Sequence, residues 1–208
     1  MGLFVLTCAA AACGSSTSSS PAQAAANAAN RLLGAQNFTF HESDHATSPI
    51  STGNFSLTTA GTRTQQAVLG TVVGTTSGGP TRFTLYATKN TYCHIGDNTA
   101  GSAGCAAGDG YDDYLTFDAL YYLRTIAKDA AHVQASGGDY TFSGSAVNNS
   151  TTPSIHEAWH GSFKIAGGYI VQLQYTQTGS EGAVGTGSVD FSKIGTSPSV
   201  NTPPGASD

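Results

Sequence analysis

The sequence predicts an α+β fold in which one curved antiparallel sheet is covered on its concave side by helices. Two observations lead to this prediction. Segments in which apolar and polar residues alternate with a period of two lie before and after a segment whose apolar residues recur every three or four positions. Gly, Pro, Asn or Ser bound the alternating segments, as is typical of strands joined by short turns. The expected order is therefore helix, meander, helix, meander.

The first helix is expected to begin at Ser20-Pro21, because serine caps helices well and proline suits their first turn. Its alanine-rich apolar stripe continues to about Gln36. Four alternating or apolar segments follow and are predicted to be strands. They are centred on Phe38 and Phe40, on Phe55 and Leu57, on Val68 to Val73, and on Phe83 and Leu85.

The second helix is expected to start at Thr116 or Asp118, either of which can cap it, and to end at Gly137-Gly138. Its apolar residues include Leu120 and Leu123. Strands are predicted again afterwards, with Gly167-Gly168 as a hairpin turn. They span Tyr140–Phe142, Ile155–Ile165, Tyr169–Tyr175 and Val184–Phe191.

The N-terminus is typical of an exported bacterial lipoprotein. Leu3 to Ala12 form an apolar segment that is too short to span a bilayer, for which a helix needs about 20 residues. It suits a signal peptide over residues 1–12, which we expect to be truncated because no basic segment precedes it. Ala10-Ala11-Ala12-Cys13-Gly14 resembles a lipobox, and the Ser-rich residues 13–22 suit a flexible tether. We therefore expect Cys13 to be lipidated, with palmitate among its acyl chains, although a plain secretory signal is the alternative.

The charge distribution excludes some classes of partner. The net charge is −5, and the eight Lys and Arg residues form no cluster, so we expect no nucleic-acid partner. A basic patch for anionic lipid is absent for the same reason. The sequence also lacks a serine-hydrolase elbow and a phosphate-binding loop, and no cofactor is expected.

Two cysteines remain in the domain, Cys93 and Cys105. In an oxidising compartment such a pair is expected to form a disulfide. A metal site that also uses His94 is the alternative.

His156-Glu157-Ala158-Trp159-His160 matches the zinc-peptidase pattern H-E-x-x-H. That chemistry needs a helix, which brings the two histidines to one face. Thr152-Pro153 before the motif and Gly161 after it favour a strand instead. The histidines would then lie about 13 Å apart, too far to share one zinc ion. We expect no catalytic and no metal-binding residues, and a zinc peptidase is the third and weakest hypothesis.

Other polar groups point to no chemistry of their own. Asp109, Asp112 and Asp113 lack the spacing of a calcium-binding EF-hand and are interpreted as a solvated loop. A second cluster near a strand end is interpreted as solvent-exposed: His41, Glu42, Asp44 and His45. Four tyrosines flank the second helix, where they either pack in the core or line a cavity mouth: Tyr111, Tyr114, Tyr121 and Tyr122.

The order of these elements resembles that of the actinobacterial lipoproteins of the LppX/LprG type and, more remotely, of the LolA/LolB lipoprotein carriers. The similar stretches are the lipobox at Cys13, the first helix leading into Asn37-Phe38-Thr39-Phe40, the helix Asp118 to Gln134, and the segments Gly138–Gly144 and Gly187–Gly195. The resemblance implies an unclosed half-barrel over residues 23–196, with helices packed on its concave face. It also implies an apolar cavity for acyl chains.

The leading hypothesis is a membrane-anchored, extracytoplasmic lipoprotein that binds or carries a lipid or lipoglycan. The alternative is a non-catalytic envelope lipoprotein whose core is filled and which binds an envelope protein. A tail at 197–208, rich in proline and small polar residues, is expected to be disordered. The candidate cavity residues are Phe38, Phe40, Phe55, Leu57, Phe83, Leu85, Leu120 and Leu123.

Overall fold

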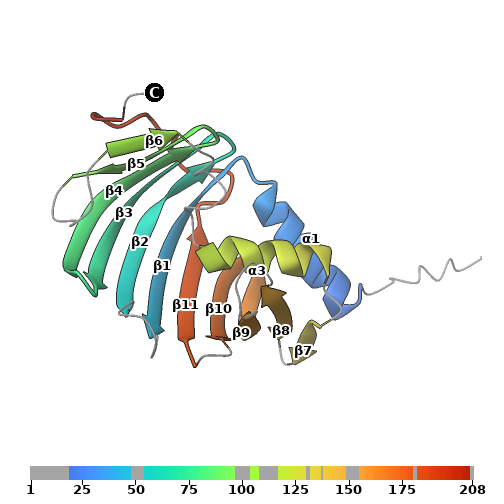
Figure 1. Cartoon of the computed structure of the whole chain (residues 1–208). Helices are drawn as coiled ribbons and strands as arrows, with labels where there is room; N and C mark the ends of the chain where they lie inside the picture. Colours follow the sequence, from blue (N-terminus) through green and yellow to red (C-terminus); the bar gives the residue numbers. More distant parts are fainter. Residues whose placement is uncertain are drawn as a thin grey trace, which may run out of the picture.

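The computed structural model describes residues 19–47, 54–96, 104–107, 117–129, 132–136, 138–148, 155–179 and 182–206. Within these residues, eleven antiparallel strands form one sheet in the order β6-β5-β4-β3-β2-β1-β11-β10-β9-β8-β7. The sheet is curved and does not close, and the helices α1 and α3 lie on its concave side (Figure 1). The predicted α+β half-barrel is confirmed.

The helices in the described residues are α1 (Pro21–Leu33) and α3 (Phe117–Lys128). The strands of the N-terminal half are β1 (Asn37–Thr47), β2 (Phe55–Thr64), β3 (Ala67–Thr76), β4 (Gly79–Thr88), β5 (Thr91–Ile95) and β6 (Gly104–Ala107). Those of the C-terminal half are β7 (Gln134–Ser136), β8 (Asp139–Asn148), β9 (Ile155–Ala166), β10 (Tyr169–Gly179) and β11 (Val184–Ser192).

The sheet consists of two meanders joined at their middle. Strands β1 to β6 form one meander and β7 to β11 the other, and β1 pairs with β11 to connect them. The predicted turn at Gly167-Gly168 joins β9 to β10, and both glycines have positive φ angles, as a two-residue hairpin turn requires. Pairing between the first and last long strands therefore holds the two halves together.

Helix α1 begins as its sequence predicts. The Ser20 side chain accepts a hydrogen bond of 3.2 Å from the backbone N–H of Gln23, and Pro21 opens the first turn. The buried face consists of small residues and one leucine, so the helix can pack closely on β10 and α3. These residues are Ala25, Ala28, Ala29 and Leu32. In the described part of the chain, neither helix is long and apolar enough to cross a membrane.

Helix α3 is shorter than the prediction. It ends at Lys128 rather than near Gly137-Gly138, because Gln134–Ser136 pairs with β8 as the edge strand β7. Gly138 has a φ of 95° and lies in the hairpin turn between these two strands. The glycine signal therefore marked a turn between strands and not the end of a helix.

Large aromatic rings on the concave face lie over glycines of the neighbouring strand. A Cβ atom at Gly144 of β8 would lie 2.7 Å from the indole of Trp159 on β9. Three other pairs share this arrangement: Phe40 over Gly61, Phe142 over Gly161 and Tyr175 over Gly187. These rings lie along the sheet because the glycines have no side chains that would occupy the same space.

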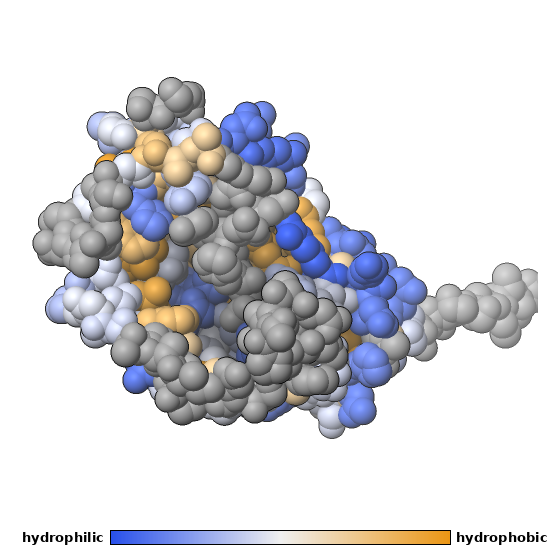
Figure 2. Space-filling view, viewed as in Figure 1, coloured by the Kyte–Doolittle hydropathy of each residue, from blue (hydrophilic) through white to orange (hydrophobic). Residues whose placement is uncertain are grey.

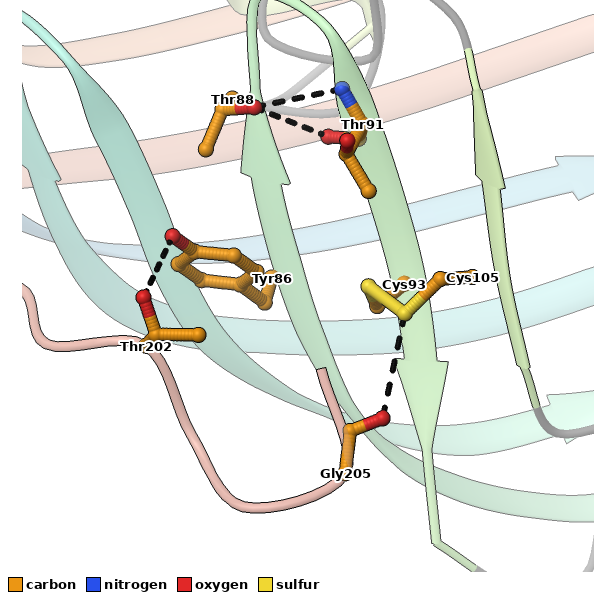
Figure 3. The surroundings of a disulfide bond; sticks show 7 residues. All are labelled: Tyr86, Thr88, Thr91, Cys93, Cys105, Thr202 and Gly205. Carbon is orange, nitrogen blue, oxygen red and sulfur yellow. Dashed lines mark hydrogen bonds between the residues drawn. A yellow bond between two sulfur atoms is a disulfide. The ribbon is translucent and has the colours of Figure 1, made fainter. Parts of the chain in front are cut away.

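The predicted disulfide between Cys93 and Cys105 is present and lies on the outer face of the sheet. The tail differs from the disorder expected there, because residues 197–206 follow this outer face. The hydroxyl of Tyr86 lies 3.1 Å from that of Thr202, and Sγ of Cys105 lies 3.9 Å from the carbonyl oxygen of Gly205 (Figure 3). Val200 and Ala206 join a small apolar cluster there, which explains why the tail packs.

Candidate functional site

The register of the sheet brings the six predicted strand residues of the cavity to one face. Directly paired residues of antiparallel strands share a face, and every second residue along a strand does so too. Phe40 pairs with Gly61, which lies on the face of Phe55 and Leu57. Gly61 pairs with Gly70, and Gly70 with Leu85. The shared face is the concave one, and the six are Phe38, Phe40, Phe55, Leu57, Phe83 and Leu85.

The eight candidate residues fall into two groups by burial. Five are core residues with at most 4% of their surface exposed: Phe38, Phe40, Leu85, Leu120 and Leu123. The other three are only half-buried: Phe55, Leu57 and Phe83. The second group provides large apolar side chains of the concave face that still reach its surface.

The two helices cover the concave face unevenly. Helix α1 packs on α3 and β10, and α3 packs on α1 and β11, so both lie over the C-terminal half of the sheet (Figure 1). In the space-filling view the molecule is hollowed beside them, and apolar residues gather along the inner side of the N-terminal half (Figure 2). Phe55, Leu57 and Phe83 belong to this half, on β2 and β4.

The cluster that the sequence suggested to be exposed is divided between the two faces. His41 and His45 are exposed, as expected, but Glu42 is only 2% exposed and lies on the concave face. Asp44 is half-buried on the same face. The interpretation was wrong for both carboxylates, because alternation along a strand turns Glu42 and Asp44 toward the face that carries Phe38 and Phe40.

Hydrogen bonds between side chains order the polar groups of this face. The hydroxyl of Tyr175 on β10 donates to Oδ1 of Asp44 at 2.5 Å. The hydroxyl of Tyr122 on α3 donates to Oε1 of Gln177 at 3.4 Å. Tyr122 is 1% exposed, which confirms the packing role for this tyrosine, whereas Tyr121 is 44% exposed. Charged and polar groups therefore accompany the aromatic core between α3 and the sheet.

We expect Tyr175→Phe to destabilise the fold by about 1.5–3 kcal/mol, because it removes a hydrogen bond to a carboxylate. Tyr122→Phe is the matched control. It removes a longer bond to a neutral amide and should cost about 1 kcal/mol or less. Urea unfolding of both variants measures the two free energies, and equal losses would contradict the assignment of the stronger bond to Asp44.

His94 lies among apolar and aromatic side chains on the concave side of β5. Its ring centroid is 4.5 Å from that of Phe83 and 6.0 Å from that of Tyr92. Burial lowers the pKa of His94 below its ordinary value of 6.5, because desolvation disfavours the charged ring. The neutral imidazole is therefore the form that suits the fold at neutral pH.

This lowered pKa predicts a pH dependence of stability. The unfolded chain binds a proton at His94 more readily than the folded chain, so the contribution of this residue is complete well above pH 6.5 and decreases as the pH falls below it. We expect the melting temperature to fall less between pH 7.5 and pH 5 in His94→Gln than in the unmodified protein. Identical pH profiles would show that His94 does not contribute.

The H-E-x-x-H motif lies on strand β9, as predicted. Glu157 and Trp159 share the concave face, whereas His160 is exposed. Positions four apart on a strand are about 13 Å apart, so the pattern cannot form the helical zinc site. In the part of the chain that the structure describes, no group of three His, Cys, Asp or Glu side chains is placed to hold a metal ion.

A polar groove of about 400 Å³ lies on the opposite, outer face. It crosses β2, β1, β11 and β10, and hydroxyl, amide and imidazole side chains provide most of its lining. Several residues singled out in the sequence lie outside the described ranges: Cys13, Asp109, Tyr111, Asp112, Asp113, Tyr114 and Thr116.

The described residues form an unclosed antiparallel half-barrel with α1 and α3 against an apolar concave face. Two solved structures of similar outline are the crystal structure of LprF from Mycobacterium bovis and that of the Mycobacterium tuberculosis lipoprotein LppX. LprF is 11% identical, with 88% of this chain and 96% of LprF covered and a TM-score of 0.46. LppX is 12% identical, with 88% of this chain and 100% of LppX covered and a TM-score of 0.47.

LppX gives its name to the family that the sequence resembles. No protein-family model matches the chain, and no curated protein sequence matches it. At these identities, function has to be argued from the residues of this chain.

Proposed function

We propose that this protein is an extracytoplasmic lipoprotein, anchored through acylated Cys13, whose concave face holds the acyl chains of a lipid or lipoglycan. The observation that carries the proposal is the group of half-buried apolar side chains at Phe55, Leu57 and Phe83. Among the described elements, the main sheet contacts of α1 and α3 are with the C-terminal half, on β7, β10 and β11. Acyl chains would complete the burial of the N-terminal half.

The energy available from such burial is large enough for stable binding. Removing an acyl chain from water contributes about 0.8 kcal/mol per buried CH₂, or roughly 8 kcal/mol for ten of them. Ordering the chain and the side chains around it offsets part of this gain. A ligand with one or more long chains would therefore remain bound through purification.

Native mass spectrometry of the full-length chain, purified from a bacterial host in mild detergent, tests the proposal. We expect a stoichiometric additional mass that organic extraction releases and identifies as a lipid. A mass without ligand, unchanged after incubation with bacterial lipid extract, would contradict it. That result would favour the alternative of a filled core that serves a protein partner.

Anchoring is tested separately, because the concave face and the N-terminus are independent features. In Cys13→Ala we expect the protein to lose incorporation of labelled palmitate and to leave the membrane fraction. Cys8→Ala is the matched control, since it removes a nearby cysteine without changing the lipobox. Membrane fractionation and metabolic labelling measure both effects. Unchanged labelling of Cys13→Ala would contradict the proposed anchor.

A further inference from the structure

The indole of Trp159 has a buried hydrogen-bond donor that no group in the described part of the chain satisfies. Trp159 is 6% exposed, and within the described residues its Nε1 has no hydrogen-bond partner. Leaving a buried donor unsatisfied costs about 1–3 kcal/mol, so such groups often mark a place where a ligand or water binds. The indole lies against Gly144 on one side and contacts the ring of Tyr121 edge-on at 5.5 Å.

The surroundings of this donor connect it to the surface and to other polar groups. Tyr121 is 44% exposed, so the ring that contacts the indole edge-on also reaches solvent. Gln177 pairs with Trp159 across β10 and β9, and it accepts the hydrogen bond of Tyr122. The unsatisfied donor is thus part of a band of polar groups beside apolar rings, which suits the polar end of an amphipathic ligand.

The charges near the indole select an uncharged partner. Glu157 lies two residues away on the same face of β9, and Asp44 lies on this face of β1. All eight Lys and Arg residues are in the described ranges, and seven of them are exposed. The eighth is Arg63, which lies eight residues along β2 from Phe55, a distance of about 26 Å at 3.3 Å per residue. Phe55 itself is level with Trp159, because directly paired residues connect the two across the sheet. A phosphate or carboxylate at the indole would meet the carboxylate of Glu157 on the same face, which disfavours an anionic partner.

We propose that Nε1 of Trp159 donates a hydrogen bond to an uncharged ester carbonyl oxygen of the bound lipid. This inference rests on the proposed function, and it adds a polar contact that selects acyl esters over ethers and over anionic head groups. The carbonyl is the natural acceptor, because it stands at the junction between the apolar chain and the polar remainder of the molecule.

The test uses the fact that Trp159 is the only tryptophan in the chain, so the ¹⁵N-labelled protein gives a single indole N–H resonance. The full-length chain, freed of lipid by organic extraction and refolded, is titrated with monomyristoylglycerol and with its ether analogue tetradecylglycerol. We expect the ester to shift the indole proton downfield and to bind about two- to twelve-fold more tightly than the ether, the range for one neutral hydrogen bond.

Trp159→Phe keeps an aromatic ring and removes the donor. We expect this variant to bind both probes with equal affinity, and because the ratio is taken within one variant, a general change in packing cancels. Myristate at pH 8 should bind the unmodified protein more weakly than monomyristoylglycerol. Equal binding of ester and ether without an indole shift would overturn this inference and leave the proposed function intact. If neither probe binds, the proposed function fails and the inference fails with it.

Discussion

Gly187→Ala is expected to destabilise the protein by about 2–3 kcal/mol, which for a chain of this size lowers the melting temperature by roughly 4–12 °C. A Cβ atom at this position would overlap Cζ and the hydroxyl oxygen of Tyr175 and lie 2.6 Å from Oδ1 of Asp44. Neither group can move freely, because each is hydrogen-bonded to the other. The substitution would displace the Tyr175 ring from its position over Gly187 on β11.

Gly185→Ala is the matched control for this prediction. Gly185 lies two residues earlier on β11 and on the same concave face, but a Cβ atom there has no other atom within 4 Å. Neither glycine has a positive φ angle, so backbone strain does not distinguish them. Thermal unfolding should show a change within about 0.5 kcal/mol for Gly185→Ala. Similar losses in both variants would contradict the packing of the Tyr175 ring over Gly187.

Leu57→Asp is expected to weaken binding of monomyristoylglycerol at least about ten-fold. The substitution places a carboxylate on the concave face where the proposal places acyl chains, and covering a charge with hydrocarbon is strongly unfavourable. Leu57 is half-buried, so the charged side chain can remain hydrated in the protein without ligand. The main effect should therefore be on binding rather than on folding.

Val73→Asp is the corresponding control on the outer face. Val73 is 45% exposed and pairs with Thr58, the residue after Leu57. The Val73→Asp substitution therefore introduces the same charge close to Leu57 but on the opposite face of the sheet. We expect its affinity for monomyristoylglycerol to equal that of the unmodified protein. Tryptophan fluorescence titrations measure both affinities, and circular dichroism confirms that both variants are folded. Equal weakening in both would place the acyl chains elsewhere.

Local patterns in the sequence were sufficient to predict much of the fold. The Ser20-Pro21 cap, the period of two around Phe38 and Phe83, and the Gly167-Gly168 turn each depend on residues close together in the chain. Their positions in the structure agree with the sequence because capping, alternation and tight turns are local in origin. Alternation also assigned Phe55 and Leu57 to one face before the register was known.

The features that were missed depend on pairing between distant segments. The end of α3 could not be predicted, because β7 exists only through its pairing with β8. Glu42 is buried and Asp44 is half-buried, but both were predicted to be exposed because they are polar. Their even spacing from Phe38 and Phe40 was the sequence signal that all four side chains share a face. The unsatisfied donor of Trp159 had no sequence signal, since it depends on which acceptors neighbouring elements provide.

In the proposed function, acyl chains occupy the N-terminal half of the concave face. Cross-linking with a monoacylglycerol that carries a diazirine near the end of its chain, followed by peptide mass spectrometry, tests this location directly. We expect cross-links to β2 and β4, at or beside Phe55, Leu57 and Phe83, and we expect excess monomyristoylglycerol to abolish them. Cross-links confined to the outer face, or unaffected by the competitor, would contradict it.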